Sequence, residues 1–276
     1  MIVMRTYAGL NAKIRNIENK WGKKHDFNQY KNYYFPQQLV KNAKTMLSFG
    51  VGADLRCEKL MCFENTQLKI KLFDPTPHTI SSIDYNLTKA CKEIAKKRLQ
   101  KRNSFSLFSL IRLMKNDKFK EQLQFFPYGY SPDNGKKTFY YDPNDENINN
   151  RIINDGTWIP ESATRCFSLK QRVKGQLTVQ ANFKNIETIM KDLNWSQVDI
   201  IKTDIEGMAI EFGRELIEKQ IKFKCWTTEV EFDIGEDQQT LKDLDKMCED
   251  FTNLGYNIYI NKVRTKPVSE LIFIDN

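Results

Sequence analysis

One short segment constrains the fold of this chain more than any other. Residues 48–54 read S-F-G-V-G-A-D and follow an apolar run. Two glycines spaced G-x-G allow the backbone to turn tightly and to approach a ligand closely. We therefore predict a strand over Thr45–Phe49, a turn at Gly50 and Gly52, and a helix over Arg56–Phe63.

The next apolar run ends in an acidic residue. Leu68–Phe73 has the pattern of a second strand, and Asp74 follows it in the sequence F-D-P-T-P. A carboxylate about 20 residues beyond a glycine turn, at the tip of the neighbouring strand, can hold two ribose hydroxyls. The two segments together predict a binding site for the nucleoside part of a cofactor.

Strand and helix patterns alternate along most of the chain. Such alternation is typical of an α/β fold with a parallel sheet covered by helices. The last two apolar runs lack a helix between them and predict an antiparallel pair. The seven expected strands are Thr45–Phe49, Leu68–Phe73, Leu123–Phe126, Val198–Lys202, Phe223–Phe232, Tyr256–Val263 and Ser269–Ile274.

The 276 residues are enough for one large domain, and no linker or internal repeat divides them. We predict a helical N-terminal lead-in over 1–40 and a single domain over 41–276. Within that domain, residues 127–182 read as an insertion that shapes the site for a second substrate. Helices are also expected over Asn86–Arg102, Ser104–Gln122 and Phe183–Leu193.

The residues around the glycine turn favour a cofactor without phosphate. The third glycine of the dinucleotide motif is missing, and two acidic residues, Asp54 and Glu58, lie where the following helix begins. Acidic residues at a helix N-terminus repel a pyrophosphate, which would otherwise bind there. A cofactor with a cationic centre fits better, and we expect S-adenosylmethionine.

Further carboxylates follow two later strands. Asp204 and Glu206 come directly after the buried run Val198–Lys202, and Glu229 and Glu231 lie near the tip of the next strand. Ligands of parallel sheets bind beyond the carboxyl ends of the strands. We therefore expect these carboxylates to face the same crevice as Gly50 and Asp74.

These motifs resemble those of the FkbM-type methyltransferases. The matching segments are S-F-G-V-G-x-D-x-x-x-E, F-D-P-T-P, V-D-I-I-K-T-D-I-E-G and the later T-E-V-E-F, in order across residues 45–275. The resemblance implies a Rossmann-like class I methyltransferase fold: a seven-stranded, mostly parallel sheet with an antiparallel C-terminal strand pair. It also implies S-adenosylmethionine-dependent O-methylation, commonly of a sugar or glycan hydroxyl or of a natural product.

The resemblance also implies roles for single residues. Gly50 and Gly52 would line the methionine part of the cofactor, and Asp74 would hold its ribose. Ser48 departs from the pattern, because many class I enzymes carry an acidic residue there, so the cofactor's amino group is left to Asp54, Glu58 or backbone carbonyls. The adenine side would be shaped by Pro75–Pro77, with Tyr128 and Gly129 opposite, and the substrate side by Asp204 and Glu206.

Methyl transfer to an alcohol needs an aligned nucleophile and a group that takes its proton. The chain has two histidines, His25 in the lead-in and His78 after the Asp74 turn. We favour Asp204 as the base, with Glu206 or Glu229 orienting the substrate. Clustered carboxylates also suit a divalent metal, but nothing in their spacing demands one, and we assign no metal ligand.

The positive charge of the chain is concentrated in one segment. Residues 89–121 carry eleven basic and three acidic side chains. The net charge of this segment, +8, equals that of the whole chain. This basic segment reads either as a solvated helix face or as a docking surface for an anionic acceptor, a polyanion or an anionic membrane surface.

The remaining features indicate a cytoplasmic protein. No apolar run approaches the roughly 18 residues that span a bilayer, and polar and charged residues interrupt the N-terminus where a signal peptide would be apolar. Six dispersed cysteines without a C-x-x-C pair read as reduced thiols rather than as a zinc site.

Two other functions stay open at this level. An RNA 2′-O-methyltransferase would use a lysine–aspartate–lysine–glutamate set, which Lys202, Asp204, Lys224 and Glu229 loosely resemble, and its RNA would lie along the basic segment. A catalytically inactive methyltransferase fold that holds a partner is the other. Cofactor binding would separate the inactive module from both enzymes.

Overall fold

The computed structural model describes residues 15–17, 19–22, 27–52, 54–101, 111, 121–141, 168–169, 177–231, 237–261 and 268–276. Its centre is a seven-stranded sheet with the order β11-β12-β10-β9-β3-β4-β5. The strands are β3 (Thr45–Phe49), β4 (Lys69–Phe73), β5 (Leu123–Phe126), β9 (Gln197–Thr203), β10 (Lys222–Glu231), β11 (Asn257–Asn261) and β12 (Val268–Ile274).

Five neighbouring strands of this sheet, from β10 to β5, run parallel. Strand β12 lies between β10 and β11 and is antiparallel to both. This is the order and direction of the class I methyltransferase fold, so the predicted fold class is confirmed. The chain reverses its direction of winding between β3 and β9, and the carboxyl ends of these two strands therefore form the topological switch point.

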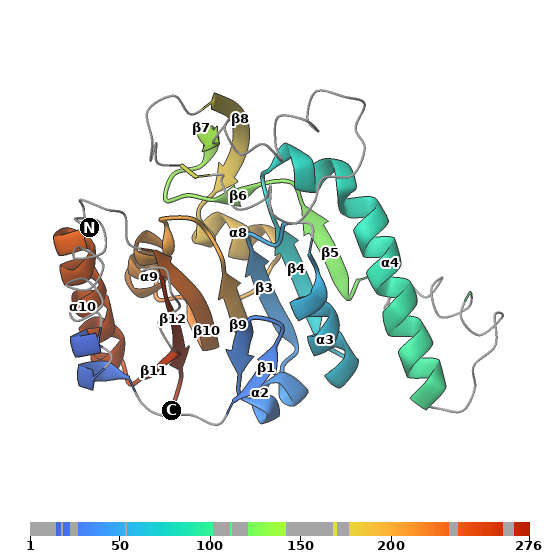
Figure 1. Cartoon of the computed structure of the whole chain (residues 1–276), viewed down its shortest axis with the longest axis horizontal. Helices are drawn as coiled ribbons and strands as arrows, with labels where there is room; N and C mark the ends of the chain where they lie inside the picture. The colour runs from blue at the N-terminus through green and yellow to red at the C-terminus, as the bar shows by residue number, and fades with distance from the viewer. Residues whose placement is uncertain are drawn as a thin grey trace, which may run out of the picture.

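Helices cover both faces of the sheet (Figure 1). One face packs against α2 (Gln37–Asn42), α3 (Arg56–Glu64) and α4 (Pro77–Lys101). The other face packs against α8 (Ile186–Asp192), α9 (Ala209–Glu218) and α10 (Asp237–Asn253). Alternate residues of each strand supply the two cores, because successive side chains point to opposite faces.

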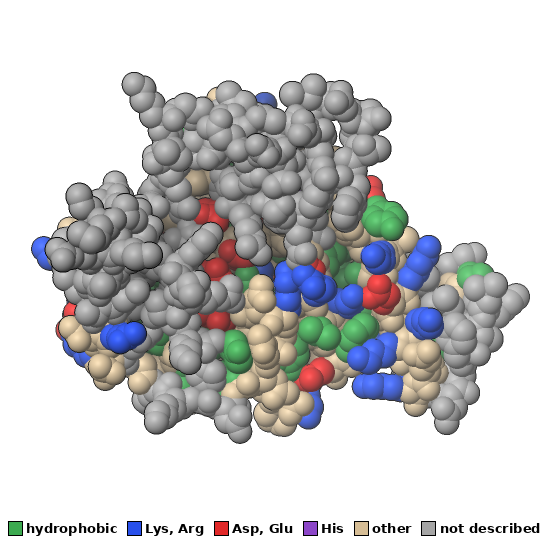
Figure 2. Space-filling view, viewed as in Figure 1, with side chains coloured by type: hydrophobic (Ala, Val, Ile, Leu, Met, Phe, Trp, Pro, Cys, Tyr) green, Lys and Arg blue, Asp and Glu red, His purple; other side chains and the backbone are tan. Residues whose placement is uncertain are grey.

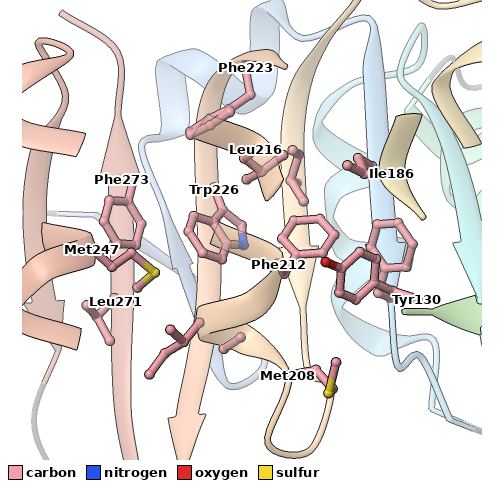
Figure 3. Close-up of a cluster of buried hydrophobic side chains, with 14 of the residues drawn as sticks. Tyr130, Ile186, Met208, Phe212, Leu216, Phe223, Trp226, Met247, Leu271 and Phe273 are labelled. Atoms are coloured by element: carbon pink, nitrogen blue, oxygen red, sulfur yellow. The ribbon is translucent and has the colours of Figure 1, made fainter. Parts of the chain in front are cut away.

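Aromatic side chains dominate the core under α9 and α10 (Figure 3). The Trp226 ring of β10 is stacked on Phe273 of β12 at 4.8 Å, and Phe212 of α9 contacts both Trp226 and Tyr130. All four side chains are at most 2 % exposed. The C-terminal strand is thus fixed by core packing as well as by its two neighbours in the sheet.

Two small sheets lie outside the central one. Strands β6 (Gly129–Tyr130), β7 (Gly135–Tyr141) and β8 (Leu177–Lys184) form a sheet in the order β6-β8-β7. Figure 1 shows it beyond the ends of β3 and β4, which places part of the predicted insertion over the carboxyl edge of the main sheet. Strands β1 (Asn28–Tyr30) and β2 (Tyr33–Phe35) form an N-terminal hairpin.

This hairpin differs from the helical lead-in expected over 1–40. Described residues 15–17 and 19–21 are helical, but Tyr33 and Phe35 alternate as buried residues of a strand that packs on the sheet face. The run Tyr33-Tyr34-Phe35 is only three residues long and wholly aromatic, so no polar residue marks the alternation in the sequence. Burial of aromatic side chains against β10 and α3 outweighs local helix preference here.

Two helix boundaries also differ from the sequence analysis. Helix α4 begins at Pro77, nine residues before the expected Asn86, because the Thr76 side chain accepts a bond from Thr79 N–H and Pro77 opens the first turn. Phe183 belongs to β8, and α8 begins only after Asn185, which caps it by accepting from Thr188 N–H at 2.9 Å. The expected helix over Ser104–Gln122 lies almost entirely outside the described residues.

Candidate active site

The glycine turn after β3 packs directly against the segment after β9. Gly50 and Gly52 have φ angles of +66° and +56°, in the left-handed region that favours glycine. Asp204 N–H donates to Phe49 O at 3.1 Å. A Cβ atom on Gly50 would lie 1.8 Å from the carbonyl oxygen of Asp204, so only glycine fits. The first and third predicted motifs therefore meet at the switch point.

Asp74 closes the same turn from the side of β4. Its Oδ2 accepts from Gly52 N–H at 2.8 Å, and its Oδ1 accepts from the N–H and hydroxyl of Thr76. Burial raises the pKa of Asp74 above its ordinary value, although these hydrogen bonds oppose the shift. A carboxylate oxygen accepts more than one hydrogen bond, so Oδ2, which accepts from Gly52 N–H, has capacity for a ligand hydroxyl.

The residues expected on the adenine side lie together beside Asp74. A Cβ on Gly129 would lie 2.9 Å from Cγ of Pro75 and 2.7 Å from the Phe183 ring, so Pro75 and Gly129 are in close contact. The Tyr128 ring lies 5.4 Å from the ring of Phe73. Burial raises the pKa of Tyr128 to about 12, which keeps its hydroxyl protonated at neutral pH.

Glu58 brings a carboxylate to the position where Ser48 lacks one. Ser48 and Lys202 are register partners in β3 and β9. The Ser48 hydroxyl donates to Glu58 Oε1 at 2.7 Å, and the Lys202 ammonium lies 3.8 Å from the same oxygen. Burial opposes the charge of Lys202, but Glu58 and Asp204 outweigh it and raise the pKa of Lys202.

Asp54, the other residue expected at the cofactor's amino group, faces the N-terminal hairpin. Its carboxylate forms ion pairs with Lys31 of the hairpin and with Arg56, the latter at 2.8 Å. Of the two acidic residues in this part of the chain, Glu58 is the one buried beside Ser48.

Asp204 is held by a residue that the sequence analysis did not single out. The hydroxyl of Tyr33, in β2, donates to Asp204 Oδ2. The Tyr33 side chain is buried, and burial together with the charges of Asp204 and Glu229 raises its pKa well above the ordinary value. The Lys202 ammonium lies 4.5 Å from the centre of the Tyr33 ring. The aromatic run Tyr33-Tyr34-Phe35 was the signal in the sequence.

The other predicted carboxylates are distributed unevenly around Asp204. The charge of Glu229 helps to raise the pKa of both Tyr33 and Lys202. Its partner in the β10–β12 register is Glu270. Glu206 is half-buried, and its backbone carbonyl accepts from the Ser168 hydroxyl at 3.5 Å. The side chain of Glu231 lies outside the described residues. The structure thus brings Asp204 and Glu229 together, with Lys202 between acidic neighbours.

Lys224 is not part of this group. It forms an ion pair at 2.7 Å with Asp199, near the beginning of β9 rather than its end. The lysine–aspartate–lysine–glutamate set is therefore not assembled, because the second lysine lies toward the opposite edge of the sheet.

The two histidines stand differently. His78 is buried in the first turn of α4, where burial lowers its pKa, and its Nε2 has no hydrogen-bond partner in the described structure. His25 lies outside the described residues. Across the described ranges, no group of three or more His, Cys, Asp or Glu side chains is arranged to hold a metal ion.

Of the comparisons with known proteins, only that with solved structures finds similar chains. No protein-family model and no curated protein matches the chain. Solved structures that resemble it include a precorrin-6y C5,15-methyltransferase from Geobacter metallireducens GS-15, with 11 % identity over 94 % of this chain and 96 % of that chain and a TM-score of 0.40. The METTL16 MTase domain has 8 % identity over 98 % and 81 % of the two chains and a TM-score of 0.38.

A methyltransferase from Pyrococcus furiosus has 12 % identity over 98 % of this chain and 99 % of that chain, with a TM-score of 0.32. These neighbours are methyltransferases of different kinds. Their similarity to this chain is low.

Proposed function

We propose that this chain is an S-adenosylmethionine-dependent O-methyltransferase. The observation that carries the proposal is the closure of the Gly50–Gly52 turn on Asp74 at the switch point, with Glu58, Asp204 and Glu229 on the adjoining side. A site with these carboxylates suits a cationic ligand and repels a pyrophosphate. When bound, the cofactor would supply a methyl group on a positively charged sulfur.

Three features of the residues fit this cofactor. Asp74 keeps acceptor capacity for ribose hydroxyls beside a glycine that allows close approach. Pro75, Tyr128 and Gly129 offer an apolar wall next to Asp74 for the adenine ring. Glu58 Oε2 is buried without a hydrogen-bond partner in the described structure, as expected of a carboxylate that awaits an ammonium group.

We assign Asp204 to the side of the site that binds the methyl acceptor, where it would act as the base. Tyr33 donates to Oδ2, which leaves Oδ1 to accept the proton of an acceptor hydroxyl. Glu229 would orient the acceptor, and the small sheet of β6, β8 and β7 would bound the pocket at the carboxyl edge of the main sheet. The resemblance to FkbM-type enzymes supports a sugar or glycan hydroxyl as the acceptor. The displacement of Lys224 disfavours the RNA alternative.

A cytoplasmic location is part of the same proposal. Cys57, Cys62, Cys91, Cys225 and Cys248 are free thiols, which suits a reducing compartment. No helix in the described ranges is both long and apolar enough to span a bilayer.

Cofactor binding tests the proposal directly. Asp74→Ala should weaken binding of S-adenosylmethionine by about 1.5–3 kcal/mol in calorimetry, the scale of a hydrogen bond to a charged group. Asp133→Ala removes an exposed carboxylate between β6 and β7 and should leave the affinity unchanged. Equal affinity of Asp74→Ala and the unmodified protein would refute the site, and no binding at all would favour the inactive module.

Turnover tests the role of Asp204. A panel of sugars, nucleotide-sugars, glycans and RNA with labelled cofactor would identify the acceptor. Asp204→Asn keeps the shape and the bond from Tyr33 but loses the base, so kcat should fall by about 10²–10⁴ with cofactor affinity retained. Normal turnover of this variant would show that Asp204 has a structural role, and His78 would then be the next candidate for the base.

A further inference from the structure

A line of lysine side chains runs along the exposed side of α4. Lys89, Lys92 and Lys96 are exposed and follow one another at intervals of three and four residues, which places them on one line of the helix. None of the three forms an ion pair with a described residue. Glu93 lies on the same stretch of helix, but it is paired with Lys59 of α3 at 2.5 Å. The charge of this line is therefore open to an anionic partner.

The line begins beside an exposed aromatic ring. Tyr85 precedes Lys89 by four residues, and 65 % of its surface is exposed. Its ring offers a flat apolar face with a polar tip. The apolar side of α4, with Ile83 and Ile94, is buried in the core between the helix and the sheet. That side is thus used inside the fold, and α4 cannot insert it into a membrane.

Helix α4 leads from the candidate site toward the opposite edge of the sheet (Figure 1). Pro77 opens the helix three residues after Asp74, at the carboxyl edge. At 1.5 Å per residue, Lys96 lies about 28 Å along the helix from Pro77. A partner that contacts the whole line is therefore an extended chain rather than a small anion, and one end of that chain lies near the candidate site.

We propose that the line Tyr85, Lys89, Lys92 and Lys96 is a docking track for a linear anionic glycan, with the methyl acceptor at the end near the candidate site. This inference rests on the proposed function, which supplies the reaction at a sugar hydroxyl. It goes further in naming the acceptor as a polyanionic chain rather than a small sugar. The lysines would hold the anionic groups of the chain, and the Tyr85 ring would pack against a sugar ring.

The kind of cation favours a glycan over RNA. A lysine ammonium is a point charge that holds carboxylate or sulfate groups at varied positions, whereas arginine is the preferred residue for recognition of nucleic-acid phosphates. The one arginine of α4, Arg98, is half-buried and donates to Gln122 at 2.6 Å. The track therefore presents lysine alone.

Binding of a size series of heparin oligosaccharides tests the track without requiring methyl transfer. Affinity should rise with chain length until the chains span the track, because each further anion meets a further lysine. Replacing Lys89, Lys92 and Lys96 together by Gln should weaken binding of the longest chain by about 10-fold and remove the gain with length. Uncharged maltooligosaccharides should show no such gain.

Two further variants control this measurement. Replacing the exposed Lys191, Lys222 and Lys242 by Gln changes the net charge equally and should preserve the gain with length. Tyr85→Ala should weaken binding of the heparin chains but leave binding of inorganic polyphosphate, which has no sugar ring, unchanged. A Tyr85→Ala variant that binds the heparin chains normally would remove the sugar from the assignment.

The outcomes distinguish this inference from the proposed function. If the protein does not bind S-adenosylmethionine, the proposed function fails, whatever the heparin series shows. If it binds the cofactor but the gain with length is absent, or survives in the triple variant of α4, the docking track does not exist. Tighter binding of a uridine oligonucleotide or of phosphatidylserine vesicles than of heparin chains would assign the line to RNA or to a membrane and overturn the glycan.

Discussion

One carboxylate is held by hydrogen bonds at each end of β9. At the carboxyl end, Asp204 is held by Tyr33. At the amino end, Asp199 Oδ2 accepts from the N–H groups of Lys44 and Thr45 at 2.6 and 3.1 Å, and Oδ1 pairs with Lys224. The first carboxylate serves the candidate site, whereas the second ties the beginning of β3 to β9.

Asp199 should make stability depend on pH. Burial opposes its ionisation, but Lys224 and the two backbone donors outweigh burial and lower its pKa below the ordinary 3.8. Its contribution is therefore present above pH 3.8 and is lost as the pH falls through the lower pKa of the folded state. Asp199→Asn should cost about 1–3 kcal/mol in urea unfolding at pH 7, and the difference from the unmodified protein should shrink below pH 4.

Lys224→Met separates the two kinds of partner. The Lys224 side chain is 57 % exposed, and exposed ion pairs contribute about 0–1 kcal/mol. This variant should therefore lose less stability than Asp199→Asn. A larger loss would show that the ion pair, rather than the backbone hydrogen bonds, carries the effect.

The N-terminal hairpin is bonded to residues in and around the candidate site. Tyr30 donates to Glu64 of α3 at 2.6 Å, Lys31 pairs with Asp54, and Tyr33 donates to Asp204. The backbone of Tyr34 adds bonds to Glu270 and Thr227. The hairpin is thus bonded to α3 and to β10 and β12, and it covers the sheet face at Lys202.

The two tyrosines of the hairpin offer a matched pair of variants. Tyr30→Phe and Tyr33→Phe each leave a carboxylate without its phenol donor, so both should lower stability by about 1–3 kcal/mol in thermal unfolding. Only Tyr33→Phe frees Asp204, and only that variant should also reduce kcat, with cofactor affinity retained. Identical kcat values for the two variants would limit the role of Tyr33 to stability.

The accuracy of the sequence analysis differed between these elements for physical reasons. The seven central strands were predicted closely because buried apolar runs carry a strong signal, and the contacts of the Gly50–Gly52 turn with Asp74 and Asp204 followed from the geometry of a parallel sheet. Tyr33 was missed because its role depends on a contact with a residue 171 positions away. The ion pair of Lys224 was likewise missed: the expected strand Phe223–Phe232 places Lys224 at its beginning, but its partner Asp199 lies on a different strand.

Across the whole molecule, charge is distributed unevenly. Figure 2 shows lysine and arginine side chains gathered over the surface where α3 and α4 lie. On α4 the exposed ones are Lys89, Lys92, Lys96, Lys97 and Lys101, and the exposed acidic side chain on that helix is Asp84. The anionic candidate site and this basic face are separate, so an acceptor could be held by one and methylated at the other.

Salt dependence tests whether the basic face of α4 docks the acceptor. If it does, KM for the acceptor should rise steeply with salt, because exposed charges are screened beyond about 10 Å at 0.1 M. Replacing Lys89, Lys92 and Lys96 by Gln should flatten that dependence.

Replacing three exposed lysines elsewhere, Lys191, Lys222 and Lys242, changes the net charge equally and should leave the dependence intact. If KM of the unmodified protein does not respond to salt, the basic face of α4 is a solvated helix surface and does not dock the acceptor.

The place of β12 in the sheet has a consequence for how the molecule is made. The last of the seven strands in the sequence occupies an interior position, paired on both sides with β10 and β11. During synthesis, β10 therefore emerges long before its partner and presents an open edge with unpaired backbone groups. The nascent chain needs protection of that edge until Val268–Ile274 has left the ribosome, and chaperone dependence of expression should end with this strand.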